Sequence, residues 1–153
     1  MRGLRLAVAA IGMFAAACAS ALETFETAPL TIETAGGPVV LTVELADSRA
    51  QQRQGLMFRR SLPEDAGMLF DYRTPRTIQM WMRNTFIPLD MIFIGVDGRV
   101  VDIAERATPL SEEIIASRAK ARAVLEVNGG AANRWGVAIG DRVVTPRFGG
   151  EAH

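Results

Sequence analysis

Polar side chains interrupt an apolar stretch between two predicted strands. They are Arg83, Asn84 and Asp90, and Trp81 stands just before them. In a pocket, Arg83 would bind an anion, and Asn84 and Asp90 would supply hydrogen bonds. Trp81 would form an apolar wall. The alternative is structural: an Arg83–Asp90 ion pair locks the loop, since an unpaired buried charge costs several kcal/mol, and Asn84 bonds the backbone.

The same region is rich in methionine, with five thioethers between positions 57 and 91. Met80 and Met82 alternate along a predicted strand, so both sulfurs point to one face. Thioethers select copper(I), which makes these two residues the alternative metal ligands. Methionine also fills gaps in ordinary cores. We therefore expect no metal site, with the Met80–Met82 pair as the alternative.

Common catalytic side chains are scarce. The sole cysteine is Cys18 and the sole histidine is His153, so a Cys/His zinc site and a Ser–His–Asp triad lack their residues. Paired carboxylates can run glycoside hydrolysis without either residue type. Nothing in the spacing brings two of the candidates together, and we expect no cofactor. The candidates are Asp65, Asp71, Asp90 and Glu105.

Composition predicts one globular domain. The 153 residues are 49% hydrophobic and 22% charged, with a formal net charge of +0. This excludes disordered and low-complexity classes and disfavours a basic nucleic-acid binder. Charge is nevertheless uneven, because residues 49–83 hold seven arginines and three acids. Such a segment binds an anion or acidic partner, or is simply solvated surface.

The N-terminus is typical of an export signal. Arg2 and Arg5 precede a 12-residue apolar stretch from Leu6 to Ala17, too short for a permanent transmembrane helix. Small residues follow, and cleavage after Ala21 fits an A-x-A site. We expect residues 1–21 to be a signal peptide and the protein to be periplasmic.

Cys18 offers a second interpretation of the same segment. The sequence Ala15-Ala16-Ala17-Cys18 is a loose version of the bacterial lipoprotein cleavage motif. A lipid on Cys18 would tether the domain to a membrane, which is the one membrane contact that we expect. Either way, no cysteine remains inside the mature fold, which must be stable without disulfides.

Alternating and turn-forming residues predict many short strands. Residues 30–34 and 39–45 form a hairpin around Gly36-Gly37, and Val96-Asp97-Gly98 forms another turn. A capping box at Ser48 and Gln51 starts a helix that Gly55 ends. The other predicted strands are 67–70, 77–82, 89–94, 100–104, 123–127 and 142–145.

Several local expectations follow from these patterns. In the strand at 123–127, Leu125 faces inward and Glu126 outward. A short helix follows Pro109, capped by Ser111 and with Leu110 packed on Ile115. Another helix at 131–135 is capped by Asn128.

Together these elements predict a mainly β fold of the α+β class. Many short strands and no long helix favour a compact, nearly closed β-barrel with two or three short helices, because closure leaves few open edges. The expected boundaries are a signal peptide at 1–21, a lead-in at 22–29, one domain at 30–146 and a tail at 147–153.

Longer runs of the sequence resemble domain of unknown function family 192. The runs are QGLMFR at 54–59, GMLF at 67–70, MWMRNT at 80–85, PLD at 88–90, VLEVNGG at 124–130 and GVAIGD at 136–141. The resemblance spans nearly all of residues 30–146. It implies a small, β-rich prokaryotic domain, often exported, and it implies no catalytic residues.

We therefore expect a non-catalytic periplasmic domain that binds a small polar or anionic ligand or a protein partner, and no nucleic acid. Its expected site is Trp81, Arg83, Asn84 and Asp90. A copper(I) protein, a carboxylate-dependent hydrolase and a purely structural module are the alternatives.

Overall fold

The structure, a computed structural model, describes residues 22–148. The predicted signal peptide, the cleavage after Ala21, Cys18 and residues 149–153 lie outside the described residues. The elements are β1 (Glu26–Thr34), β2 (Gly37–Leu45), α1 (Arg49–Gln54), β3 (Ala66–Arg76), β4 (Gln79–Met80), β5 (Leu89–Ile94), β6 (Val100–Ala107), β7 (Ile115–Ala116), β8 (Ala121–Asn128), α2 (Ala131–Trp135), β9 (Arg142–Val144) and the 3₁₀ helix η1 (Pro146–Phe148).

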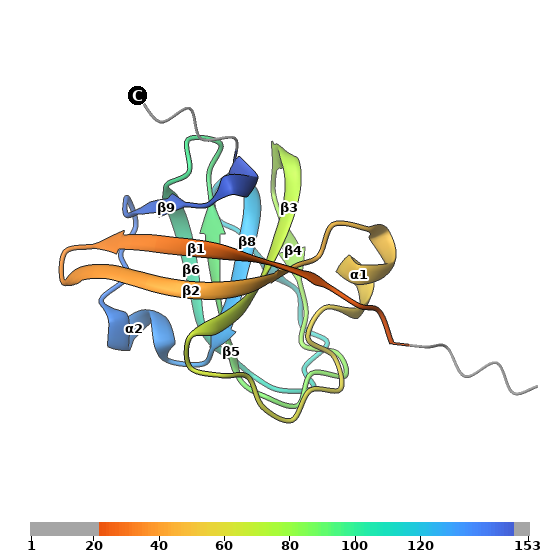
Figure 1. Cartoon of the computed structure of the whole chain (residues 1–153). Coiled ribbons are helices and arrows are strands. Elements are labelled where there is room, and N and C mark those ends of the chain that lie inside the picture. The colour runs from red at the N-terminus through yellow and green to blue at the C-terminus, as the bar shows by residue number, and fades with distance from the viewer. Residues whose placement is uncertain (1–21, 149–153) are drawn as a thin grey trace, which may run out of the picture.

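One curved sheet dominates the molecule (Figure 1), which confirms the mainly β class. Its seven strands run in the order β6-β5-β8-β3-β2-β1-β9, while β4 and β7 form a separate pair. The sheet has the nearly closed, barrel-like form expected, and it is not a complete barrel because β6 and β9 remain edge strands. The bridge between Arg99 and Arg142 joins the ends of these edges. The curvature of the sheet thus brings its two edges together, although no continuous ladder of hydrogen bonds joins them.

The two helices lie at different ends of the sheet (Figure 1). Strands β2 and β3 are parallel, so the chain must cross over between them. Helix α1 occupies that crossover. The predicted capping box is present: Ser48 accepts from the Gln51 backbone N–H, and the Gln51 side chain accepts from the Ser48 N–H. Gly55, at φ 48°, ends the helix as predicted.

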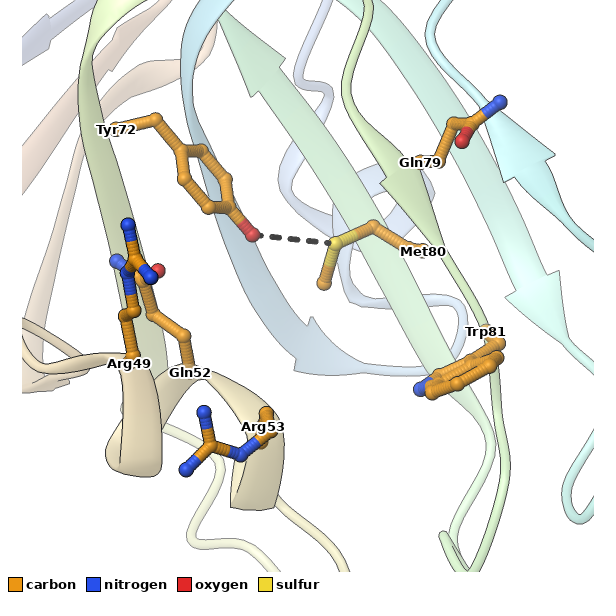
Figure 2. Close-up of a pocket in the computed structure, with 7 residues that line it drawn as sticks. All are labelled: Arg49, Gln52, Arg53, Tyr72, Gln79, Met80 and Trp81. Atoms are coloured by element: carbon orange, nitrogen blue, oxygen red, sulfur yellow. Dashed lines mark hydrogen bonds between the residues drawn. The ribbon is translucent and has the colours of Figure 1, made fainter.

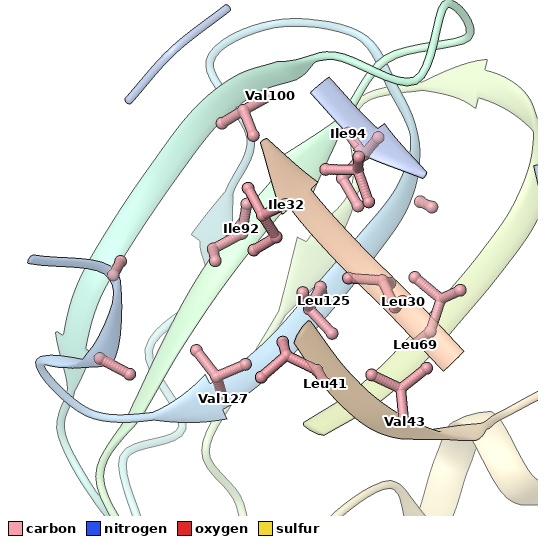
Figure 3. Close-up of a cluster of buried hydrophobic side chains, with 14 of the residues drawn as sticks. Leu30, Ile32, Leu41, Val43, Leu69, Ile92, Ile94, Val100, Leu125 and Val127 are labelled. Atoms are coloured by element: carbon pink, nitrogen blue, oxygen red, sulfur yellow. The ribbon is translucent and has the colours of Figure 1, made fainter. Parts of the chain in front are cut away.

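Apolar side chains pack on both faces of the sheet, in two clusters. One cluster fills the concave space between β1, β2, β5 and β8 (Figure 3). The other gathers methionine and aromatic side chains beneath α1 and β4. All six residues of β5 are buried, as in a strand that lies inside the sheet and is covered on both faces.

Glu126 is buried, and the expectation that it faces solvent is wrong. Its strand, β8, lies between β3 and β5 and is covered on both faces. Leu125 points to the first cluster as predicted. Glu126 points the other way, but that direction leads to the second cluster, and only 4% of the residue is exposed. Alternation gives a side chain's face, and only the tertiary fold tells whether water reaches it.

The predicted helix after Pro109 is absent, and the chain turns there instead. Leu110 adopts a left-handed φ of 63°, which ends any helix. Ser111 accepts from the N–H of Glu113, two residues on, as in a side-chain-closed turn. The predicted strand at 77–82 shortens to β4, and β1 begins at Glu26, inside the expected lead-in. Similarly, η1 lies at the start of the expected tail.

Candidate functional site

Asp90 is a structural anchor. It is fully buried, and its carboxylate accepts from three backbone N–H groups, those of Arg106, Gly130 and Ala132, at 2.7–2.9 Å. Two of these donors lie at the start of α2, so Asp90 caps that helix from a distant strand. The expected cap, Asn128, instead donates to the carbonyl of Leu62. Here the helix is as predicted but its cap is not.

The Arg83–Asp90 ion pair of the alternative, structural interpretation does not form. Arg83 is half exposed and lies 3.6 Å from the Glu112 carboxylate. Its guanidinium also lies 5.9 Å from the ring centre of Trp81. Because Asp90 is buried and satisfied by amides, the two charges have no reason to meet. The interpretation of an Arg83–Asp90 pair that locks the loop is therefore wrong: Asp90 is bound by backbone amides, and Arg83 lies beside Glu112.

Asn84 shapes the turn between β4 and β5. It has a left-handed φ of 54°, a conformation that Asn tolerates better than most residues. Its carbonyl accepts from the Phe58 N–H, and its side-chain amide lies 3.9 Å from the Met57 sulfur. Asn84 thus joins this turn to the segment that follows α1.

Of the four expected residues, Trp81 lines the best-formed pocket of the described residues, and Arg83, Asn84 and Asp90 do not. The pocket, of about 360 Å³, lies between α1 and β4 (Figure 2). This volume is within the range of small-molecule sites. Arg49 and Arg53 extend from α1, Tyr72 from β3, and Met80 and Trp81 from the facing segment. Gln52 and Gln79 complete the lining.

The pocket carries uncompensated positive charge. Within residues 22–148, neither Arg49 nor Arg53 forms an ion pair, and no acid lines the pocket. Two guanidinium groups thus face an aromatic and thioether wall. Guanidinium groups bind carboxylates and phosphates through paired hydrogen bonds. The uneven arginine distribution indicated such a surface, but it did not indicate which arginines form it.

A narrow crevice of about 30 Å³ continues from this pocket. The two hollows share Gln52, Arg53, Met80 and Trp81. At the crevice lies Glu126, whose carboxyl group forms no hydrogen bond or ion pair in the described part of the chain. Sequence reasoning missed this residue, because a single acid in an alternating strand is usually a solvent-facing one.

Burial sets the protonation of both acids near the crevice. Loss of solvation raises the pKa of Glu126 to about 8, so the carboxyl is mostly protonated at neutral pH. Burial also raises the pKa of Tyr72, with Arg76 opposing and Glu126 adding to the shift. The Tyr72 hydroxyl donates to the Met80 sulfur at 3.8 Å. Both groups are neutral donors at pH 7.

The alternative copper ligands, Met80 and Met82, lie in different surroundings. Met82 is fully buried in the second cluster, whereas Met80 lines the pocket and accepts from Tyr72. Within residues 22–148, no group of three or more His, Cys, Asp or Glu side chains is placed to hold a metal ion.

One further candidate carboxylate, Asp71, forms a structural ion pair. Asp71 is buried and bonded to Arg122 at 2.7 Å. Asp65 and Glu105 are exposed. In the described part of the chain, no helix is long and apolar enough to cross a membrane.

Comparison with known proteins decides the family. The model of the family DUF192, described as "Uncharacterized ACR", matches residues 30–145. The chain belongs to the DUF192 family. This confirms the resemblance drawn from the sequence runs, and the function of the family is unknown.

Two crystal structures are similar to this DUF192 domain over most of its length. One, from Sinorhizobium meliloti 1021, is described as a putative transcription regulator. It is 45% identical, with a TM-score of 0.78, covering 82% of this chain and 98% of that one. The other, a protein of unknown function from Novosphingobium aromaticivorans, is 37% identical, with a TM-score of 0.76, covering 94% and 99%. No curated protein matches this chain.

The sequence runs that resemble the DUF192 family converge on the crevice. The run at 54–59 contributes Gly55, Leu56 and Met57, and the run at 67–70 contributes Phe70. The remaining lining residues of these runs are Gln54, Met80, Trp81, Thr85 and Glu126. Segments far apart in the chain are thus brought together at one hollow.

Proposed function

We propose that this DUF192 domain binds a small anionic ligand with a planar apolar body in the pocket between α1 and β4. The observation that carries the proposal is the pair of arginines, Arg49 and Arg53, with no ion-pair partner within residues 22–148 and facing Trp81. The expected site thus moves from the Arg83–Asp90 loop to α1, with Trp81 in common.

The chemistry of the lining supports a ligand of this kind. Hydrogen bonds to charged groups contribute about 1.5–3 kcal/mol each, so two guanidinium groups supply the anion's anchor. Trp81 is 46% exposed and offers a flat face for an apolar ring. A concave site of this volume is better suited to binding a small molecule than to binding the flat surface of another protein.

The protein is proposed to do this in the periplasm. The support is the N-terminal pattern of Arg2 and Arg5 before a short apolar stretch. Mass spectrometry of the purified protein's N-terminus tests this. A chain that begins at Leu22 supports export as a free domain, and a lipidated Cys18 supports the tethered form. An intact Met1 in the envelope fraction would contradict both.

Thermal unfolding with added ligands tests the binding proposal. The purified protein is heated with sodium benzoate, phenyl phosphate or glucuronate, and with the neutral benzyl alcohol. A ligand at 100 times its dissociation constant stabilises the native state by about 2.7 kcal/mol, so an anion should raise the Tm by several degrees and the alcohol should not.

Matched arginine variants locate the effect. Arg53→Gln removes a pocket charge and should abolish most of the anion-induced rise in Tm. Arg60→Gln removes an exposed arginine outside the pocket and should leave the rise unchanged. Equal losses in both variants would indicate nonspecific ion binding and would refute the pocket assignment.

A further inference from the structure

The crevice beside the arginine pocket holds a carboxyl group without a partner. Glu126 is 4% exposed, and its neighbours on the adjoining strands are Met68 on β3 and Met91 on β5. Within residues 22–148 nothing donates to it or pairs with it. Its oxygens are not among the fully enclosed unpartnered side-chain atoms of the described residues, which are Glu44 Oε2 and Arg147 Nε, so they open onto the crevice that Glu126 lines. A group left in that state next to a ligand-sized pocket is a candidate for ligand contact.

Few charged or titratable groups face this carboxyl. Helix α1 contributes Arg53, which lines the same crevice, and β3 contributes Tyr72, whose hydroxyl bonds Met80. The facing segment contributes Met80 and Trp81, and the turn after it contributes Thr85. Neither β4 nor β5 brings an ionisable side chain to the crevice. On the same turn, Arg83 is directed to Glu112 instead.

The protonation of Glu126 and the volume of the crevice are both consistent with a hydrogen bond from its carboxyl group to a ligand oxygen. Desolvation raises the pKa of Glu126 to about 8, so at neutral pH the group carries an O–H that needs an acceptor. The crevice, of about 30 Å³, has room for at least one ligand oxygen. Arg53, which lines the same crevice, favours a negatively charged oxygen there.

We propose that Glu126 is a second anchor of the pocket, whose carboxyl O–H donates a hydrogen bond to an oxyanion that Arg53 also binds. The ligand is then a carboxylate or phosphate on a planar apolar body that lies against Trp81. The inference rests on the proposed function and adds that ligand binding requires the protonated form of this one glutamate.

Proton linkage is the measurable consequence. Above pH 8 the free protein must take up a proton to bind, so affinity falls as the pH rises. With a pKa of about 8, affinity should be about tenfold weaker at pH 9 than at pH 7. Arginine stays charged throughout this range and cannot produce the same loss.

Isothermal titration calorimetry measures this directly. Benzoate and phenyl phosphate are titrated into the wild-type protein and Glu126→Gln at pH 7 and pH 9, in two buffers of different ionisation enthalpy. The difference between buffers counts the protons taken up on binding. Glutamine keeps an N–H donor in the same place and does not titrate, which makes it the matched control.

The inference expects proton uptake by the wild type at pH 9, little at pH 7, and none by Glu126→Gln. The variant should also show equal affinity at the two pH values. Binding of benzoate alone assigns a carboxylate ligand, and binding of phenyl phosphate alone assigns a phosphate. If the wild type binds without proton uptake, the role of Glu126 is refuted while the arginine pocket stands. If neither anion binds, both proposals fail. The wild-type proton count stands by itself if the variant does not fold.

Discussion

Two buried acids in this protein, Asp90 and Glu126, differ in their hydrogen-bond partners. Asp90 is surrounded by backbone donors, three of which bond its carboxylate. Glu126 receives no such bonds from residues 22–148, and its burial raises its pKa. The Asp90 carboxyl is satisfied by backbone donors and holds the fold together, whereas the Glu126 carboxyl is left without a partner among the described residues. This contrast separates the structural acid from the candidate ligand group.

Removing the Asp90 carboxylate should destabilise the fold strongly. Asp90→Ala leaves the N–H groups of Arg106, Gly130 and Ala132 buried without their acceptor. We expect a loss of about 3 kcal/mol in the free energy of unfolding, measured by urea denaturation. The alternative, that Asp90 belongs to the ligand site, predicts an unchanged stability and a lost anion response.

The stability of the protein should fall with pH because of Glu126. In the unfolded chain this group titrates at its ordinary value of 4.5, and in the folded chain at about 8. Between these values folding takes up a proton, so the free energy of unfolding falls by up to about 1.4 kcal/mol per pH unit.

Urea denaturation of the wild type and Glu126→Gln from pH 5 to pH 9 checks this. The wild type should lose stability relative to the variant as the pH rises toward 8, and the difference should then level off. Parallel curves over the whole range would mean that Glu126 is not shifted.

Among the elements, the turn at 108–114 differs most from expectation. Leu110 has a φ of 63° and is 58% exposed. Its N–H donates to the Thr85 carbonyl, which ties this turn to the one after β4. The left-handed region costs a residue with a side chain roughly 1–2 kcal/mol, so this tie is made at the expense of local strain.

Leu110→Gly should therefore stabilise the protein or leave it unchanged. Glycine keeps the N–H and relieves about 1–2 kcal/mol of strain, against about 0.5–1 kcal/mol of lost chain entropy. Ile114→Gly is the control, because Ile114 is similarly exposed at 55% and has no positive φ. It should lose about 1 kcal/mol. Equal losses in chemical denaturation would show that Leu110 is not strained.

Local patterns predicted the elements that depend on neighbours in sequence. The hairpin of β1 and β2, the turn at Gly98 and the capping box of α1 all rest on contacts within a few residues. The cap of α2 does not depend on neighbours in sequence, because it is provided by Asp90, which lies 40 residues from Gly130. The pocket also depends on long-range contacts, since α1, Tyr72 of β3 and Trp81 are distant in sequence and meet in the folded structure.

At the scale of the whole molecule, the sheet curls without closing. Strand β9 pairs with three residues of β1, and its Val143 N–H donates to the carbonyl of Gly98 at the turn between β5 and β6. The prediction of a nearly closed, barrel-like fold is therefore confirmed, and the sheet does not close into a complete barrel. The number of strands and the spacing of turns do not determine whether a ladder of hydrogen bonds forms between the two edge strands, β6 and β9.

Adjacent valines on β9 test this role. Val143 is 3% exposed and packs on the first cluster, whereas Val144 is 43% exposed. Val143→Ala should cost about 2 kcal/mol of unfolding free energy, from lost burial and a cavity. Val144→Ala should cost under about 0.5 kcal/mol. If urea denaturation shows the same loss of unfolding free energy in both variants, Val143 of β9 does not contribute to the core.

The pocket between α1 and β4 is the central claim, and the two tryptophans of the chain allow it to be tested directly. Trp81 lines the pocket, while Trp135 lies in α2, away from it. In a titration with benzoate at pH 7, followed by NMR of the two indole N–H signals, the Trp81 signal should move and saturate while that of Trp135 stays still. A static Trp81 signal, or equal movement of both signals, would contradict the account.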